Sequence, residues 1–140
     1  MSYTRFPAAP VIGWTKYSVT HVAMRAAALT SNITLFTLAP KHVVHKIILK
    51  PSVAFAGTGI TAYTISLGIA GTLDKYIAAF DVLQAVAATT FGLSAASVNA
   101  TPESFSAGVA VKIAATAVDA NLDQSTAGTL DIYVLTSHLP

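Results

Sequence analysis

A strict alternation of apolar and polar residues constrains this chain more than any other feature. In residues 60–69, apolar side chains alternate with threonine, serine and glycine, and residues 129–136 repeat the pattern. A period of two places successive side chains on opposite faces of a strand. We therefore predict that both segments are partner strands of a half-buried antiparallel sheet, and that most of the remaining chain forms strands and turns around the same core.

Other segments show the same β signature between turn residues. Pro51 limits its own segment to an edge, a bulge or a strand start. Gly57 and Gly59 are expected to form a turn that joins residues 53–56 to the strand beginning at Ile60 as a hairpin. The further predicted strands are residues 17–25, 32–38, 42–49, 53–56 and 105–118, the last of which is expected to be the longest.

Residues 74–89 are the exception to the β pattern. Asp74 is a suitable N-cap, and Ile77, Phe80 and Leu83 recur at helical spacing in alanine-rich sequence. The spacing predicts a short helix. The alternative is a loop with a brief strand at residues 80–83.

About seven or eight strands with regularly spaced turn residues predict an all-β fold, an antiparallel two-sheet sandwich or jelly roll. The chain has 140 residues, which is enough for one domain with a full core. Pro7 and Pro10 fix φ and remove hydrogen-bond donors near the N-terminus. We expect residues 1–14 to form an extended N-terminal arm and residues 15–140 to form a single jelly-roll domain. Phe6 and Trp14 of the arm either grip a partner, since aromatic residues are enriched at interfaces, or fold back on their own core.

Composition excludes several classes of protein. The chain contains no cysteine, which rules out disulfides and thiolate metal sites. Only 10% of its residues are charged, against about 25% in an ordinary soluble domain, and a surface so poor in charge is often covered by other chains. Residues 51–73 are uncharged and long enough to span a bilayer. Their hydroxyl-rich alternation favours a sheet, so no membrane association is expected, and the prolines of the first ten residues argue against a signal peptide.

The charges are unevenly distributed along the sequence. Residues 1–50 contain six basic residues and no acidic residue, whereas the remainder contains two lysines and six acidic residues, for nets of +6 and −4. One interpretation is that early and late strands lie side by side and offset each other. The other is a basic contact face for an acidic partner. Direct nucleic-acid binding is not expected, because such proteins cluster basic and aromatic residues more densely.

The sequence offers no convincing catalytic or cofactor site. It lacks a nucleophile elbow, a phosphate loop and a dinucleotide fingerprint. Asp74 and Asp81 would share a helical face, but two carboxylates alone do not make a hydrolase. His42 and His45 resemble a metal pair, yet residues three apart on a strand face opposite sides. We expect no enzyme activity, no cofactor and no bound metal.

A second motif, Asp119-x-Asn121-x-Asp123, matches the opening of a calcium loop. The loop pattern then requires glycine where Gln124 stands and glutamate where Leu130 stands. We expect a loop whose Asx side chains cap their own backbone, with calcium binding as the weaker alternative.

Four segments carry a family resemblance, namely residues 46–59, 60–69, 76–82 and 121–134. Together they resemble the small jelly-roll cement, or decoration, proteins of tailed-bacteriophage capsids. The resemblance rests on the order and the residue types of these segments rather than on a short motif, and it runs from about Lys41 to the end of the chain. The N-terminal arm departs from it most.

The resemblance implies a non-enzymatic virion protein on the outer surface of a capsid, made in the host cytoplasm. Its implied partners are the major capsid protein and further copies of itself, as a homodimer or homotrimer. The basic N-terminal half would then face acidic patches of the capsid protein. The expected interface residues are Arg5, Phe6, Trp14, Lys16, Lys41, Lys46 and Lys50.

Two alternatives come from other functional classes. A tail or receptor-recognition module would bind glycan through loop aromatics such as Tyr63, Tyr76 and Tyr133. A metal-dependent jelly-roll enzyme would instead use histidines. Those available are His21, His42, His45 and His138.

Overall fold

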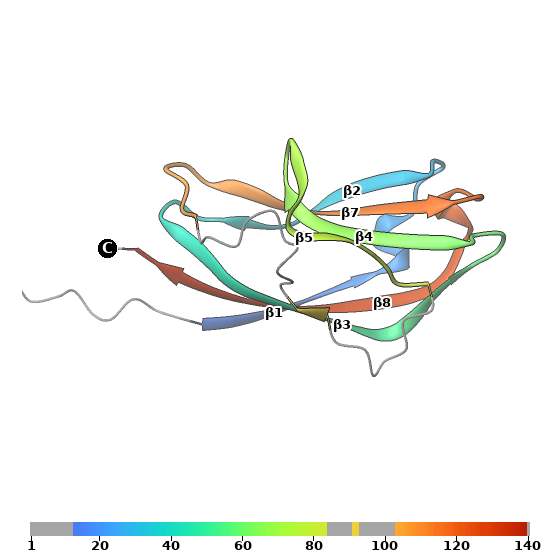
Figure 1. The fold of residues 1–140 in the computed structure, drawn as a ribbon, viewed down its shortest axis with the longest axis horizontal. Coiled ribbons are helices and arrows are strands. Elements are labelled where there is room, and N and C mark those ends of the chain that lie inside the picture. Colours follow the sequence, from blue (N-terminus) through green and yellow to red (C-terminus); the bar gives the residue numbers. More distant parts are fainter. Residues whose placement is uncertain (1–12, 84–90, 93–102, 140) are drawn as a thin grey trace, which may run out of the picture.

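The computed structural model describes residues 13–83, 91–92 and 103–139. These residues form eight strands and two short 3₁₀ helices (Figure 1). The strands are β1 (Gly13–Thr20), β2 (Thr30–Leu38), β3 (His42–Gly57), β4 (Ala62–Ile69), β5 (Thr72–Asp81), β6 (Phe91–Gly92), β7 (Val109–Val118) and β8 (Ser125–His138), and the helices are η1 (His21–Met24) and η2 (Leu122–Gln124). Within the described chain, neither helix is long and apolar enough to cross a membrane.

The strands form two antiparallel four-stranded sheets, which Figure 1 shows as two stacked layers. Their orders are β1-β8-β3-β6 and β2-β7-β4-β5. The strand pairs β1 and β8, β2 and β7, β3 and β6, and β4 and β5 are all adjacent. The chain is thus one long hairpin of four strand pairs rolled into a sandwich, which is the jelly-roll arrangement. The predicted all-β, two-sheet fold is confirmed.

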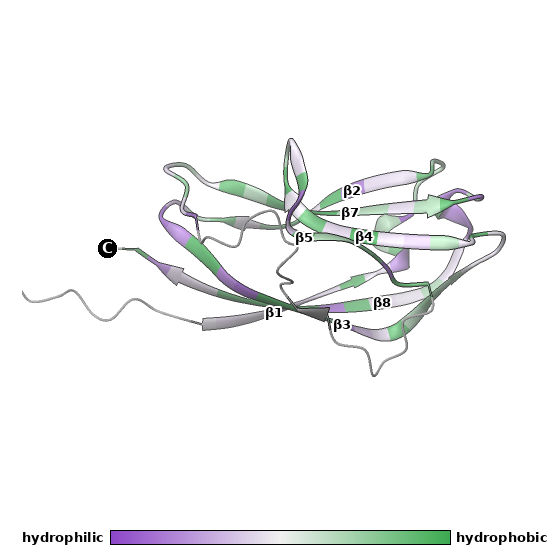
Figure 2. Cartoon of the chain, in the orientation of Figure 1, coloured by the Kyte–Doolittle hydropathy of each residue, from purple (hydrophilic) through white to green (hydrophobic). Residues whose placement is uncertain are grey.

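The core lies between the layers and is built by the apolar residues of the alternating pattern. Figure 2 shows hydrophobic and hydrophilic bands along the strands of both layers. Leu130 and Ile132 of β8 and Ile65 and Leu67 of β4 are completely buried. However, β4 and β8 belong to opposite sheets, so the prediction that they are partner strands of one sheet is wrong. Alternation shows which side chains of a strand face the core, but it does not show which strand lies beside it.

A cross-layer contact shows how closely the sheets pack. The ring centroids of Phe55 and Tyr63 lie 5.0 Å apart. Gly128 of β8 has a φ of 141°, and a Cβ added there would lie 2.3 Å from the Phe55 ring. Glycine is therefore required at this position both for its backbone conformation and for the space that the ring occupies.

The predicted helix over residues 74–89 is wrong for its described part. Residues 72–81 form β5, in which Ile77 and Phe80 pair with Leu67 and Ile65 of β4 across a register shift. Ile65 and Leu67 are two residues apart and share one face of β4, so the shift places Ile77 and Phe80, which are three residues apart, against that same face. A spacing of three residues on one face is typical of a helix, which explains the wrong prediction. Residues 84–89 lie outside the described residues.

The predicted hairpin around Gly57 is also wrong, because the turn carries the chain from β3 in one sheet to β4 in the other. β3 continues through Pro51 as a strand of 16 residues, longer than the 10-residue β7. The register with β8 shifts between Pro51 and Val53, which confirms a bulge next to the proline.

The first strand is displaced towards the N-terminus relative to its predicted position. β1 ends at Thr20, and η1 follows with Met24 buried at 1% exposure. The strand begins at Gly13, so Gly13 and Trp14, which were assigned to the arm, are strand residues. Residues 1–12 of the predicted arm lie outside the described residues.

Candidate assembly surface

The outer surface of β1, β8 and β3 carries side chains aligned in three rows. Antiparallel pairing places residues of the three strands directly opposite one another. The residues between them along each strand, such as Val19, Ile132 and Leu49, point into the core. The rows are Trp14, Leu135 and Lys46; Lys16, Tyr133 and Ile48; and Ser18, Asp131 and Lys50. We call these nine residues the β1-β8-β3 face.

The centre of this face is apolar and partly aromatic. Tyr133, Ile48 and Leu135 are half-buried, and Trp14 is 51% exposed at the edge strand. Large aromatic side chains that are exposed on a rigid sheet are enriched in protein interfaces. The face therefore offers an aromatic anchor on a surface that is already ordered.

Lysines surround this apolar centre, with one carboxylate among them. Asp131 accepts a hydrogen bond from Ser18 Oγ at 2.6 Å and lies 3.4 Å from Lys16 Nζ. Lys16 Nζ also lies 5.7 Å from the centroid of the Tyr133 ring. Three lysines against one aspartate give the nine residues a charge of +2, and Lys46 and Lys50 form no ion pair within the described part of the chain. The face is suited to an acidic partner.

Four of the predicted interface residues are brought together here, namely Trp14, Lys16, Lys46 and Lys50. Lys41 is not among them. It precedes β3 with a φ of 61°, where its backbone N–H bonds the carbonyl of Phe105 at 3.0 Å. Arg5 and Phe6 lie outside the described residues.

Sequence reasoning missed the other five members of this face, which are Ser18, Ile48, Asp131, Tyr133 and Leu135. Their outward orientation follows from alternation, but their proximity to Lys16 and Lys50 depends on which strands pair and in which register. That information appears only when β8 is placed between β1 and β3. The Lys16–Asp131 pair supports the first interpretation of the charge distribution at one position, whereas Lys46 and Lys50 of the same face form no ion pair in the described part of the chain.

The outer surface of β2, β7 and β4 has a different character. Thr30, Thr116 and Thr64 form one row across these strands. Lys112 lies further along β7, with its Nζ 3.4 Å from Asn32 Oδ1. This row of threonines has no aromatic anchor comparable to Trp14 of the β1-β8-β3 face.

The four histidines do not converge on one site. His42 and His138 pair across β3 and β8, with ring centroids 4.9 Å apart. His45 forms a hydrogen bond with the Ser137 hydroxyl, while His21 lies 3.3 Å from the Gly128 carbonyl oxygen. Within residues 13–83, 91–92 and 103–139, no three side chains of the metal-binding types form a group that could hold an ion.

The loop that resembles a calcium site is held by other contacts. Asp119, at a φ of 71°, accepts a hydrogen bond from the Thr61 hydroxyl. Asn121 makes no side-chain cap to η2, contrary to the expected Asx capping at that residue. Backbone bonds of 2.9 Å instead tie Leu122 and Asp123 to residues 28 and 26.

Two of the tyrosines considered for glycan binding lie in the core rather than in loops. Tyr63 is 0% exposed and Tyr76 is 5% exposed. Burial raises the pKa of each hydroxyl to about 12, and the nearby Glu103 carboxylate acts on the pKa of Tyr76 in the same direction. Of the three, only Tyr133 is accessible, as part of the β1-β8-β3 face.

Comparison with known proteins identifies the fold. No protein-family model and no curated protein matches the sequence. Among solved structures, a chain of the cyanophage Pam1 capsid asymmetric unit matches with a TM-score of 0.66 and 19% identity, covering 100% of this chain and 93% of that one. The chain shares its fold with a phage capsid protein.

Two further phage capsids contain similar chains. A chain of the acid-stable capsid of Helicobacter pylori bacteriophage KHP30 matches with a TM-score of 0.57 and 16% identity, covering 91% of this chain and 87% of that one. A chain of the Ralstonia phage GP4 capsid matches with a TM-score of 0.57 and 17% identity, covering 99% and 92%. In all three cases the shared fold spans nearly the whole of both chains.

Proposed function

We propose that this chain is a structural virion protein that binds the outside of a bacteriophage capsid and cements neighbouring major capsid protein subunits. The observation that carries the proposal is the nearly full-length fold shared with chains of three phage capsids. Because the similar chains are of almost the same length, the likeness concerns the entire small domain rather than a module within a larger enzyme.

The β1-β8-β3 face is the proposed contact with the capsid. Trp14 would insert between side chains of the major capsid protein, and Lys46 and Lys50 would face carboxylates of that protein. These side chains stand on paired strands, so docking immobilises little additional chain. Each copy contributes a contact of modest strength, and many copies on one shell reinforce it against internal pressure through multivalency.

This role requires no reaction and no cofactor. It places the protein on the outer surface of the virion after synthesis in the host cytoplasm. Arg5, which precedes the described residues, and Lys41, at the end of the sandwich, are further proposed contacts outside the β1-β8-β3 face.

Co-sedimentation with capsid shells that lack this protein tests the proposal. The wild-type chain should saturate the shells at a fixed ratio to the major capsid protein. A Trp14→Ala, Lys46→Glu, Lys50→Glu variant should bind at least roughly tenfold more weakly, because it loses the anchor and reverses two charges. Lys112→Glu, on the opposite outer surface, is the matched control and should bind as the wild type does.

Two outcomes would contradict separate parts of the proposal. If the triple variant bound as tightly as Lys112→Glu, the β1-β8-β3 face would not be the contact. If the wild-type chain showed no saturable binding to intact shells, the cementing role itself would be wrong.

A further inference from the structure

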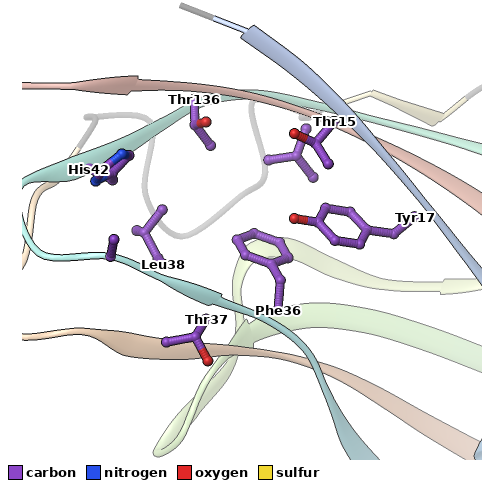
Figure 3. Close-up of a pocket in the computed structure, with 9 residues that line it drawn as sticks. Thr15, Tyr17, Phe36, Thr37, Leu38, His42 and Thr136 are labelled. Atoms are coloured by element: carbon purple, nitrogen blue, oxygen red, sulfur yellow. The ribbon is translucent and has the colours of Figure 1, made fainter. Parts of the chain in front are cut away.

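A pocket opens at the end of the sandwich where β1 begins and β8 ends (Figure 3). It lies between the two layers and has a volume of about 180 Å³. Thr15 and Tyr17 come from β1, Phe36 and Leu38 from β2, and Thr136 from β8. The other lining residues are Thr37, Ala39, His42 and Val134.

The pocket has the size for one aromatic ring, and its lining combines aromatic and aliphatic side chains with three threonines and His42. A cavity of about 150 Å³ lined by apolar side chains can hold benzene, whereas pockets for drug-sized ligands measure roughly 300–1,000 Å³. The Tyr17 and Phe36 rings stack in parallel to form one wall, with centroids 4.8 Å apart. Leu38 and Val134 add aliphatic surface, and a ring placed among them would bury apolar area on several sides.

The position of the pocket favours an extended chain as its occupant. β1 is an edge strand of one sheet and β2 is an edge strand of the other, so the pocket opens between two edges. In the described part of the chain, β1 pairs only with β8 and β2 only with β7. An edge strand presents backbone N–H and C=O groups to which an extended segment can add.

The chain itself supplies such a segment. Residues 1–12 precede β1, whose first residue, Gly13, lies two positions before Thr15 of the pocket. They include Phe6, followed by Pro7, and proline favours an extended conformation for itself and for the residue before it. Phe6 therefore stands on a segment suited to lie along a strand edge.

We propose that Phe6 of a second copy of this chain occupies the pocket, with its N-terminal arm along the edge of β1. A chain's own Phe6 is poorly placed, because β1 runs from Gly13 towards Tyr17 and an extended arm leads away from the pocket, over about 24 Å for seven residues. The arm of a neighbouring copy needs no reversal. Mutual exchange of arms would join copies in a closed dimer or ring. The proposal concerns self-association and stands independently of capsid binding.

Cysteine cross-linking tests this directly, because the chain contains no cysteine of its own. A Thr4→Cys, Thr15→Cys variant, which keeps Phe6, is oxidised under mild conditions and analysed by non-reducing electrophoresis. We expect disulfide-linked oligomers, and mixing isotope-labelled with unlabelled protein should show by mass spectrometry that residues 4 and 15 of different copies are joined. The matched control is Thr4→Cys, Thr116→Cys, in which the second cysteine replaces an exposed threonine on the other outer surface.

Two results would overturn the proposal. One is a disulfide within a single copy, which would mean that the arm folds back into its own pocket. The other is cross-linking no greater than in the Thr116→Cys control, which would mean that the pocket holds no arm.

Sedimentation equilibrium provides a measurement without cysteines. Phe6→Ala should weaken self-association at least roughly tenfold, as expected for loss of a buried aromatic anchor, and should leave the circular dichroism spectrum unchanged. Tyr3→Ala removes the other aromatic residue of residues 1–12 and should have little effect. A Phe6→Ala dissociation constant within about twofold of the wild-type value, or a wild-type chain that is monomeric at all concentrations, would contradict the proposal.

Discussion

Tyr63 places a hydroxyl group in the centre of the sandwich. Its ring packs against Phe55, but the hydroxyl oxygen has no hydrogen-bond partner among the described residues. A buried polar group without a partner costs about 1–3 kcal/mol. At this position the tyrosine ring stabilises the core, whereas the unpaired hydroxyl lowers the free energy of unfolding.

We predict that Tyr63→Phe raises the free energy of unfolding by about 1 kcal/mol, because it keeps the ring and removes the unpaired hydroxyl. Urea denaturation at neutral pH measures the change. Tyr133→Phe, which alters a half-buried tyrosine at the surface, is the control and should change the stability little. A loss of stability in Tyr63→Phe would show that a buried water or another group satisfies the hydroxyl.

At the level of elements, the sequence predicted the faces of strands better than their partners. The buried positions of β4 and β8 follow directly from alternation, since side-chain direction depends only on local geometry. Which strand lies beside β4 depends on the path of the entire chain. The segment at Ile77 and Phe80 was misassigned for the same reason, because its bulged pairing with β4 is a tertiary feature that overrides local spacing.

Asp81 links the end of β5 to the start of β4. Its Oδ1 accepts hydrogen bonds from the backbone N–H of Leu83 at 2.9 Å and of Tyr63 at 3.3 Å. We predict that Asp81→Ala lowers the free energy of unfolding by about 1–2 kcal/mol, because two backbone donors lose a charged acceptor. Thermal and urea denaturation measure the loss. Asp74→Ala removes an exposed carboxylate from the same strand and should cost less than half as much, and equal costs would show that Asp81 does not have this role.

At the level of the whole molecule, the candidate assembly surface was predictable only in part. Composition and the basic N-terminal half indicated a contact face and named Trp14, Lys16, Lys46 and Lys50. Asp131 and Tyr133 belong to a distant part of the sequence, and they join the face because the last strand inserts between the first and the third. A single sequence does not specify that insertion, since many strand orders satisfy the same alternation.

The two core tyrosines give the whole fold a distinctive dependence on alkaline pH. Burial raises the pKa of Tyr63 and Tyr76 from 10.0 to about 12. Between these values the folded state retains protons that the unfolded state has lost, so increasing pH favours unfolding. Below about pH 10, both hydroxyl groups keep their protons in the folded and the unfolded state, so the free energy of unfolding is not reduced by this effect. Each tyrosine should then remove roughly 1.4 kcal/mol per pH unit up to about pH 12.

We predict that urea midpoints measured between about pH 8 and pH 11 remain level up to about pH 9.5 and then fall steeply. The Tyr63→Phe, Tyr76→Phe variant removes both hydroxyl groups while retaining both rings, so its midpoint should fall much less over the same interval. Tyr133→Phe controls for removal of a tyrosine outside the core. If the double variant lost stability as steeply as the wild type, deprotonation of the two core tyrosines would not account for the alkaline unfolding.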